Sequence, residues 1–307
     1  MTNDLARKAR SVDHLVLPVS QLSEARRRLS LLGFTVAPDA QHPFGTANVC
    51  SFFADDTYLE MLAVDRSPLY EAAAQRNNSF IQRDLSYRFR NGDDGFSGIA
   101  FKTDDSRGDH AEFKRRGISG GRMVEFSRSF ISSEGKREKG SFRLAFAADL
   151  RAPDAFFFTC QRLAYPKTDR SHLITHENGV TGLREILLCE EQPEDFSDLL
   201  QGVFHAAARR REDGSLAITA KNSNIEVMTP TQFNRCFGWS PELHGRGLRL
   251  SGLVFSVASL YVVEQLLTRN GIAFTKSDGR VLVHPAAGQG TLFVFEGSQS
   301  CRPLILP

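Results

Sequence analysis

The chain has 307 residues, and its 38 Lys and Arg residues nearly balance its 36 Asp and Glu residues, which leaves a formal net charge of +2. This balance disfavours a nucleic-acid-binding surface, which needs clustered basic residues. Hydrophobic residues make up 41% and charged residues 24% of the chain, a composition that excludes an extended disordered protein. No apolar run is long enough to cross a bilayer, so no membrane partner is expected.

The cysteines and the first residues indicate the compartment. The five cysteines are scattered and form no C-x-x-C pair, which disfavours a disulfide framework or a structural zinc site. The opening segment MTNDLARKAR is charged and lacks the apolar core of a signal peptide. The sequence therefore predicts a reduced, cytoplasmic protein.

Four stretches of the chain share one pattern, in which a short apolar strand is followed by an amphipathic helix and then by a glycine with an apolar neighbour. They begin at VDHLVLPVS, FSGIAFKTDD, TGLREILLCEE and LSGLVFSVAS. An interval of 19 residues recurs in all four, from His14 to Gly33, Gly98 to Gly117, Leu183 to Gly202 and Gly252 to Gly271. Self-similarity at a fixed spacing indicates duplicated structural units.

Each unit is predicted to be β-α-β-β-β. In the first, Leu22, Ala25, Leu29 and Leu32 form one apolar stripe of a helix, and Gly33 suits the left-handed residue that ends it. Strand candidates such as NVCSFFA and TYLEMLAV follow. One such sheet is too small to bury both of its faces, so the four units should form two pairs. The fold class expected is α+β. The polar, glycine-containing segment 128–143 is expected to be an exposed loop, with a lid over the first cup as the alternative.

Several motifs carry a family resemblance. The first unit contains DHLVLPVS, LLGFTV, HPFGTAN and YLEML, and FFFTCQ and HENGVTGLREI follow later in the chain. Together with the repeated units, these resemble the vicinal oxygen chelate superfamily, which includes glyoxalase I, extradiol dioxygenases and bleomycin-resistance proteins. The motifs of the first unit are most similar to the glyoxalase-like domain family.

The resemblance implies two barrels of paired units. Residues 11–165 would form the first barrel, with the candidate active cup, and residues 176–300 the second. In the superfamily a divalent metal lies inside such a cup, held by the first and last strands of each unit. The second barrel offers Leu183 and Gly252 on its first strands and only Glu226 as a carboxylate, so we expect it to be structural.

The resemblance also points to a ligand set in the first cup. His14 and Glu60 occupy the ligand positions of the first unit, and one ion of Fe, Mn, Ni or Zn would suit imidazole and carboxylate ligands. The second unit departs from the pattern, because its first strand has Gly98 and its last strand offers only Cys160 or Gln161. Three hypotheses stay open for His14 and Glu60: a metal site, a metal-free pocket in which they bind or deprotonate a substrate, and a structural hydrogen bond between them.

Four further residues are candidates for contact with a substrate: His42, Thr46, Asn48 and Gln161. His42, Thr46 and Asn48 lie in HPFGTAN, where a turn leads back into a strand. For His42 and Asn48 the alternatives are an exposed loop histidine and an amide that pairs with turn backbone.

The function favoured by the resemblance is an enzyme of the glyoxalase-like class, a lyase or isomerase acting on a small oxygenated metabolite. His14 and Glu60 would bind a metal or act directly. The alternative is a metal-free binding or resistance-type protein, and an extradiol-type dioxygenase is a weaker third, because the second pair of units lacks its two histidines and glutamate. The partners expected are a small molecule and, for a homodimer, a second copy of the chain.

Overall fold

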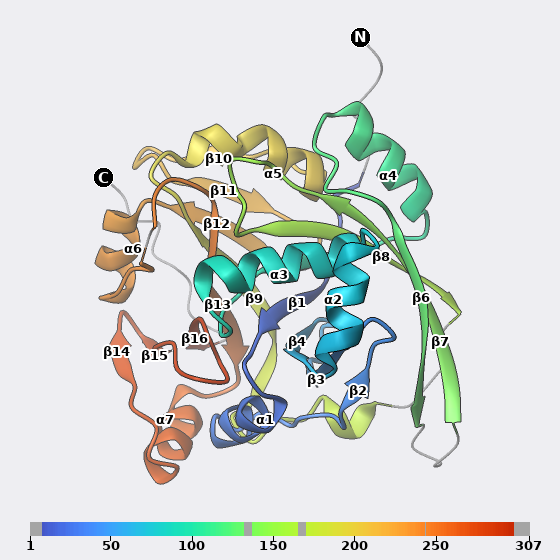
Figure 1. Cartoon of the computed structure of the whole chain (residues 1–307). Helices are drawn as coiled ribbons and strands as arrows, with labels where there is room; N and C mark the ends of the chain where they lie inside the picture. The colour runs from blue at the N-terminus through green and yellow to red at the C-terminus, as the bar shows by residue number, and fades with distance from the viewer. Residues whose placement is uncertain (1–7, 132–136, 165–169, 243, 298–307) are drawn as a thin grey trace.

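The computed structural model describes residues 8–131, 137–164, 170–242 and 244–297. Its strands form two mixed sheets of eight strands each, and the chain completes the first sheet before it begins the second (Figure 1). Each sheet combines two β-α-β-β-β units that meet at their first strands, β1 with β5 and β9 with β13. The predicted α+β fold of paired repeat units is thereby confirmed.

The first sheet has the strand order β2-β3-β4-β1-β5-β8-β7-β6. Its edge strands β2 and β6 contact each other, so the sheet curls into a nearly closed barrel. The strands are β1 (Val12–Pro18), β2 (Ala40–Gln41), β3 (Thr46–Phe52), β4 (Tyr58–Val64), β5 (Gly98–Lys102), β6 (Val124–Ile131), β7 (Arg137–Ala147) and β8 (Phe156–Ala164).

The second sheet has the corresponding order, β10-β11-β12-β9-β13-β16-β15-β14. Its strands are β9 (Val180–Cys189), β10 (Arg209–Arg210), β11 (Leu216–Thr219), β12 (Asn224–Met228), β13 (Arg249–Val257), β14 (Thr275–Ser277), β15 (Arg280–Val283) and β16 (Leu292–Gly297). The residue ranges 11–165 and 176–300, expected for the two barrels, stay a prediction, because the two sheets share one apolar core.

The helices of the described residues are α1 (Leu22–Leu31), α2 (Ser67–Gln75), α3 (Ser79–Asn91), α4 (Ser106–Arg115), α5 (Ser197–Phe204), α6 (Pro230–Phe237) and α7 (Leu260–Arg269). Two short 3-10 turns cover Ser171–Leu173 and Pro193–Phe196. Across the described ranges, none of these helices combines the length and the apolar character that a bilayer span requires.

The repeated glycines end three of the four predicted helices. Gly33, Gly117 and Gly271 have φ of +83°, +72° and +66°, the left-handed conformation that a residue with a Cβ rarely adopts. In the third unit the interval of 19 residues ends inside α5, and His205, with φ of +53°, takes the left-handed position instead.

Two segments differ from the sequence-based expectation. Residues 128–143 are not a loop throughout, because β6 and β7 extend into this segment from both sides as a long hairpin. Residues 132–136 lie outside the described residues. Helices α2 and α3, which the repeat pattern does not predict, lie against the first sheet (Figure 1). Their residues Tyr70, Phe80 and Ile81 belong to the apolar cluster inside the first cup.

The outer faces of both sheets share one apolar core. A single cluster of buried residues joins alternate residues of both sheets with α1, α4, α5 and α7. Phe34 lies at its centre, with its ring 6.1 Å from that of Phe53 on the first half and 5.4 Å from that of Phe255 on the second. The cups therefore lie back to back, and their inner faces have separate apolar clusters.

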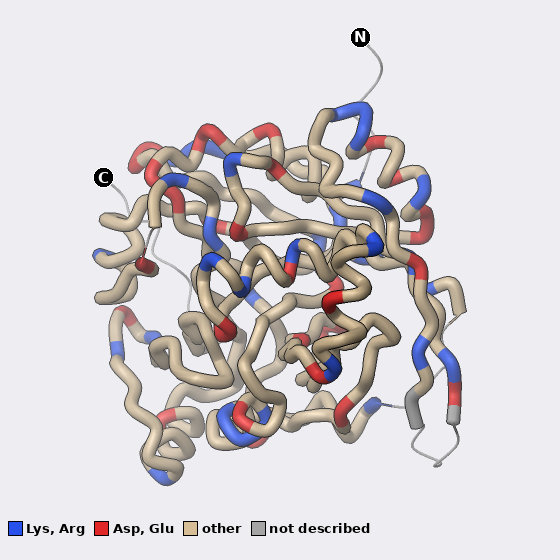
Figure 2. The backbone as a smooth tube through the Cα atoms, viewed as in Figure 1, with Lys and Arg blue, Asp and Glu red and all other residues tan. Residues whose placement is uncertain are grey.

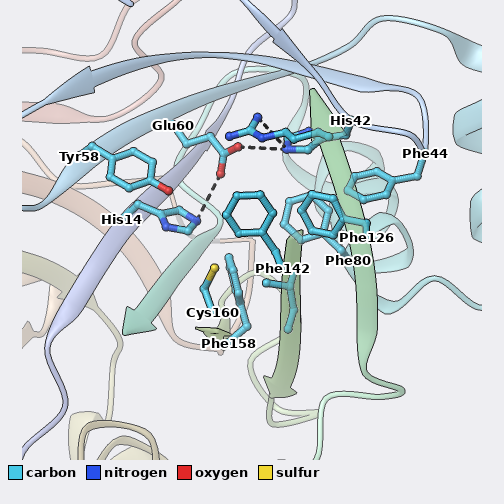
Figure 3. Close-up of a pocket in the computed structure, with 12 residues that line it drawn as sticks. His14, His42, Phe44, Tyr58, Glu60, Phe80, Phe126, Phe142, Phe158 and Cys160 are labelled. Carbon is cyan, nitrogen blue, oxygen red and sulfur yellow. Dashed lines mark hydrogen bonds and ion pairs between the residues drawn. The ribbon is translucent and has the colours of Figure 1, made fainter. Parts of the chain in front are cut away.

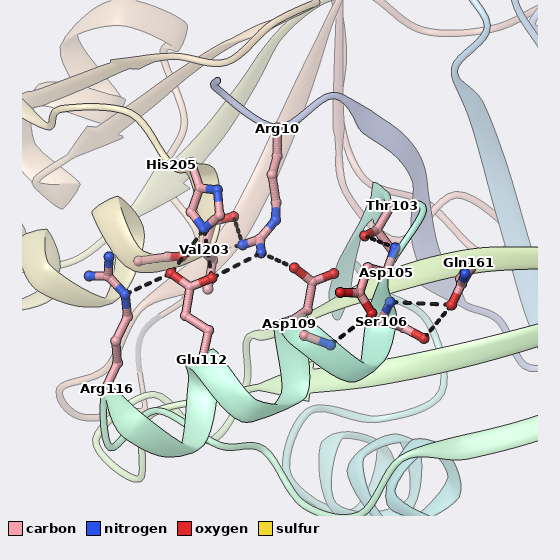
Figure 4. Close-up of polar contacts among 12 residues, drawn as sticks. Arg10, Thr103, Asp105, Ser106, Asp109, Glu112, Arg116, Gln161, Val203 and His205 are labelled. Carbon is pink, nitrogen blue, oxygen red and sulfur yellow. Dashed lines mark hydrogen bonds and ion pairs between the residues drawn. The ribbon is translucent and has the colours of Figure 1, made fainter. Parts of the chain in front are cut away.

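A group of buried charges also joins the two halves (Figure 4). Arg10, just before β1, is 7% exposed; it forms an ion pair with Asp109 of α4 and donates to the Val203 carbonyl of α5 at 3.2 Å. Glu112 of α4 accepts from His205 at 3.2 Å. Elsewhere basic and acidic residues are interspersed over both halves (Figure 2).

The shared core makes a quantitative prediction for Phe34. Removing its ring leaves a cavity where both sheets meet, so we expect Phe34→Ala to lower the free energy of unfolding by about 3–5 kcal/mol in urea titrations. Phe89→Ala is the matched control, because the Phe89 side chain is 91% exposed and should change stability by less than about 0.5 kcal/mol. Equal stability of the two variants would contradict the role assigned to Phe34.

Candidate functional site

The strand register brings His14 and Glu60 together. Strands β1 and β4 are parallel, and His14 pairs with Tyr58 while Val16 pairs with Glu60. Because side chains alternate between the faces of a strand, His14 and Glu60 both point into the first cup. Their exposed fractions are 4% and 5%, and His14 Nε2 lies 3.3 Å from Glu60 Oε2 (Figure 3).

A tight turn places His42 above this pair. The His42 amide donates to the Thr46 carbonyl at 2.8 Å, and Gly45 between them has φ of +92°. A Cβ on Gly45 would lie 2.5 Å from the Tyr70 amide nitrogen at the start of α2, so only glycine lets the turn pack there. The His42 ring stacks on Phe44 at 5.0 Å and faces the interior of the barrel.

Glu60 is the centre of the polar contacts. Its Oε1 accepts from the Asn48 side-chain amide and lies 3.7 Å from His42 Nε2. Arg128 of β6 approaches from the opposite edge of the barrel, and its Nη1 lies 3.2 Å from Asn48 Oδ1 and 3.3 Å from His42 Nε2. The sequence candidates His14, His42, Thr46, Asn48 and Glu60 are therefore gathered in one place.

The electrostatic surroundings keep Glu60 ionised. Burial by itself would raise the pKa of Glu60, but the hydrogen bond from His14 and the charges of His14 and Arg128 outweigh it and hold the pKa at about 2. For His42, burial and then the charge of Arg128 lower the pKa to about 3. His42 is therefore neutral at pH 7, with Nδ1 donating to Thr46 Oγ1 at 3.0 Å and Nε2 accepting from Arg128.

His14 is held between two carboxylates. Its Nδ1 lies 2.8 Å from Asp13 Oδ2, and its Nε2 faces Glu60. Burial alone would lower the pKa of His14, but the hydrogen bonds to Asp13 and Glu60 outweigh burial and raise it above 6.5. Asp13 is fully buried and also accepts from Arg162 of β8 at 2.8 Å. His14 is therefore set to carry a proton on both ring nitrogens.

A small cavity opens beside these groups. Its volume is about 30 Å³. His14, Glu60, His42 and Arg128 form its polar side. The remaining wall is mostly apolar and includes Phe44, Phe80, Phe126, Phe142, Leu144 and Phe158 (Figure 3).

The second unit contributes only apolar groups at the corresponding positions. Gly98 pairs with Phe156 as His14 pairs with Tyr58, so the residue that corresponds to Glu60 is Phe158. Cys160 lines the cavity, and burial raises the pKa of its thiol. Gln161 points away from the cavity, because it lies on the other face of β8, where its Oε1 accepts from the Ser106 hydroxyl at 2.9 Å (Figure 4).

The residues of the cup do not fit a superfamily-type metal centre. Although the cup contains two histidines and a glutamate, no group of three or more His, Cys, Asp or Glu in the described ranges is arranged to hold a metal ion. The Nε2 lone pair of His42 faces Arg128, and Asn48 donates to one Glu60 oxygen. Arg128 thus places a fixed positive charge beside His42 and Glu60, the two side chains that would have to bind the metal ion together.

Sequence reasoning missed Asp13 and Arg128. Asp13 precedes His14, and strand alternation places it on the opposite face of β1. Nothing in the sequence pattern therefore shows that its carboxylate turns back to contact Nδ1 of His14. Arg128 lies in the segment whose polar composition predicts a loop. A signal was available, because Val124, Phe126 and Arg128 alternate along β6, so that the arginine continues an inward-facing apolar row.

The second cup is built differently. Glu226 of β12 forms an ion pair with Arg211, and Phe233 and Phe237 of α6 pack among the inner-face residues. A cavity of about 200 Å³ lies on this sheet, with Arg184, Glu185 and Arg211 among its lining residues but no histidine or cysteine. Chemically useful groups thus converge in the first cup, although its cavity is smaller. The structural role expected of the second barrel stays a prediction.

Comparison with known proteins assigns the chain to a family. The family model for a glyoxalase-like domain matches residues 12–204, which is more than half of the chain, and the chain belongs to that family. The match ends at the last residue of α5. Among curated proteins, none matches the sequence.

Solved structures share the fold over nearly the whole chain. A hypothetical protein from Staphylococcus aureus has a TM-score of 0.64 at 11% identity and covers 93% of this chain and 98% of its own. A mutant of 4-hydroxymandelate synthase from Streptomyces coelicolor has a TM-score of 0.62 at 12% identity, with coverage of 96% and 94%. The Mn(II)-bound glyoxalase from Novosphingobium aromaticivorans has a TM-score of 0.54 at 10% identity, with coverage of 95% and 83%. These likenesses establish the fold alone.

The low pKa of His42 makes stability depend on acidity. Between its ordinary pKa of 6.5 and about 3, the unfolded chain binds a proton at His42 that the folded chain excludes. This group therefore adds stability above pH 6.5, and its contribution is lost as pH falls through that window, by at most about 1.4 kcal/mol per pH unit. We expect His42→Gln to flatten the dependence of unfolding free energy on pH between 6 and 4, measured in urea.

His172→Gln is the control for this measurement, because His172 is an exposed residue of a 3-10 turn. It should keep the wild-type slope. If His42→Gln kept that slope as well, His42 would not be excluded from protonation in the folded protein.

Proposed function

We propose that this member of the glyoxalase-like domain family is an enzyme, an isomerase or lyase that moves a proton at a carbon next to a carbonyl group of a small oxygenated metabolite. The observation that carries the proposal is the pairing of a buried glutamate with a histidine that is held protonated from behind by Asp13. Both side chains face the same cavity. Family membership supports the class of reaction without naming the substrate.

Glu60 would act as the base and His14 as the acid. Glu60 takes a proton from carbon while His14 donates its Nε2 proton to the carbonyl oxygen, so a C–H bond breaks and an O–H bond forms as the enol appears. The pair begins as carboxylate and imidazolium and ends as carboxylic acid and neutral imidazole. Its net charge is zero throughout, which suits a buried site where an uncompensated charge is costly.

The pKa values require the two transfers to be coupled. A carboxylate whose pKa is about 2 is a weak base for a carbon acid unless the carbonyl oxygen receives a proton in the same step. If the enol then receives a proton on the neighbouring carbon, the reaction is an isomerisation. If a group instead leaves from the enol, the reaction is an elimination. Asn48 would act as a positioning residue by fixing the orientation of the Glu60 carboxylate.

A second candidate is a protein that binds a ligand without turnover. The observation that favours it is that each polar atom of the His14 and Glu60 side chains already has a partner within the protein. The extradiol-type dioxygenase hypothesis finds no such support, because the cup offers no three-ligand arrangement in the described ranges.

Isotope exchange tests the proton transfer. In D₂O, the wild-type protein should exchange the C–H proton next to the carbonyl of at least one of pyruvate, 2-oxobutanoate, glycolaldehyde, dihydroxyacetone and phenylpyruvate, followed by ¹H NMR and corrected for exchange without enzyme. Glu60→Gln should slow that exchange by about 10²–10⁴-fold, the usual contribution of a general base.

Glu226→Gln provides the matched control for this exchange, because Glu226 lies on β12 at the position that corresponds to Glu60 on β4. It should leave the exchange rate unchanged. Exchange that survived in Glu60→Gln would contradict the proposal, and binding without exchange by the wild type would favour the second candidate.

Metal removal gives a separate prediction. Because the donor set of the cup does not fit a metal ion, exchange by the wild type should stay within about twofold after dialysis against EDTA and desalting into metal-free buffer. The metal content before and after dialysis can be measured by mass spectrometry. A loss of exchange that added Mn(II) or Fe(II) restored would contradict the metal-free mechanism.

A further inference from the structure

Arg128 is the cup residue whose charge is least compensated by direct contacts. Its Nη1 serves two neutral acceptors, Asn48 Oδ1 and His42 Nε2, and its guanidinium lies 5.7 Å from the centre of the Phe142 ring. No carboxylate of the described residues lies within ion-pair distance of it, and its Nε and Nη2 donate to no described group. A guanidinium has five N–H donors in a planar fork, so a pair of them remains for a ligand.

The charges around the cup leave a positive excess. Glu60 and Asp13 are the carboxylates, and His14 and Arg162 are their direct cationic partners. Arg128 is then an additional charge, because its printed contacts go to the neutral side chains of Asn48 and His42.

The wall beside Arg128 is made of flat apolar side chains. Phe126 precedes it on the same face of β6, and the Phe126 ring lies 5.3 Å from that of Phe142 and 5.1 Å from that of Phe44. Rings arranged at these distances favour another flat apolar group in contact with them. An anion-binding fork and an aromatic wall therefore meet at the cavity that contains His14 and Glu60 (Figure 3).

We propose that Arg128 binds the carboxylate of the substrate, and that the substrate is a small monocarboxylate carrying a flat apolar group. This inference rests on the proposed function, because it names the substrate class of the same site. The carboxylate would accept from the donors of Arg128 that Asn48 and His42 leave available, while the flat group lies among the phenylalanines.

Binding of unreactive probes tests the inference on the full-length protein. By calorimetry, phenylacetate should bind at least tenfold more tightly than its neutral analogue phenylacetamide, and at least tenfold more tightly than acetate. Arg128→Met should bring the affinities for phenylacetate and phenylacetamide to within about twofold of each other. Circular dichroism and a thermal melt establish that the variant is folded.

Arg143→Met is the matched control. Arg143 lies on the adjacent strand β7, at a position that pairs with Glu125 and faces away from the cup, and it donates to Glu125 at 2.8 Å. This variant should keep the wild-type preference for phenylacetate. The inference is overturned if the wild type binds neither aromatic probe, binds both aromatic probes equally, or binds acetate as tightly as phenylacetate. It is also overturned if Arg128→Met keeps the preference.

Failure of this inference can be told apart from failure of the proposed function. Glu60→Gln should still prefer phenylacetate, because it removes a negative charge near Arg128 without removing the arginine. A preference that depends on Arg128, together with hydrogen exchange that does not depend on Glu60, would leave the substrate class standing and reject the acid–base mechanism. The reverse pair of results would reject the substrate class alone.

Discussion

A carboxylate that stays ionised inside an apolar barrel is the constraint on which the site depends. Glu60 is 5% exposed, and taking a charge out of water costs several kcal/mol unless other groups replace the water. His14, Asn48 and the charge of Arg128 do so. His14 in turn needs Asp13, and the buried Asp13 needs Arg162. The negative charge of Glu60 on β4 thus requires further charges of alternating sign, two on β1 and one on β8. Each of these groups fixes the protonation state of its neighbour.

The sequence predicted the units because duplication leaves a periodic record. The recurring interval of 19 residues indicated the units, and the family resemblance pointed to His14 and Glu60 as groups that face each other in the first cup. Contacts between distant segments left no such record. Arg128 reaches Asn48 because the barrel closes where β6 meets β2, and closure depends on the curl of the whole sheet. The polar composition of 128–143 is typical of loops, yet a hairpin strand can be polar where its residues reach water or a charged site.

The two halves of the first barrel have diverged in what they offer a ligand. At the position that corresponds to His14, a side chain on Gly98 would collide with the Phe156 ring, because a Cβ there would lie 2.9 Å from it. At the position that corresponds to Glu60, Phe158 packs its ring edge-on to His14 at 5.5 Å. The first unit therefore contributes the histidines and the glutamate, while the second contributes Arg128 and much of the apolar wall around them. The two units thus share one backbone arrangement but present different chemical groups to the cavity.

Helix α5 belongs to the third unit by sequence and to the first sheet by contact. The ring of Phe204 lies 4.9 Å from Phe101 and 6.3 Å from Phe157 on the outer face of that sheet, and the Phe204 carbonyl accepts from the Arg10 amide at 2.9 Å. A fragment that stopped at the linker after β8 would uncover this apolar surface and leave the Arg10 amide without its acceptor. The repeat boundary after β8 is therefore the wrong place to cut the chain.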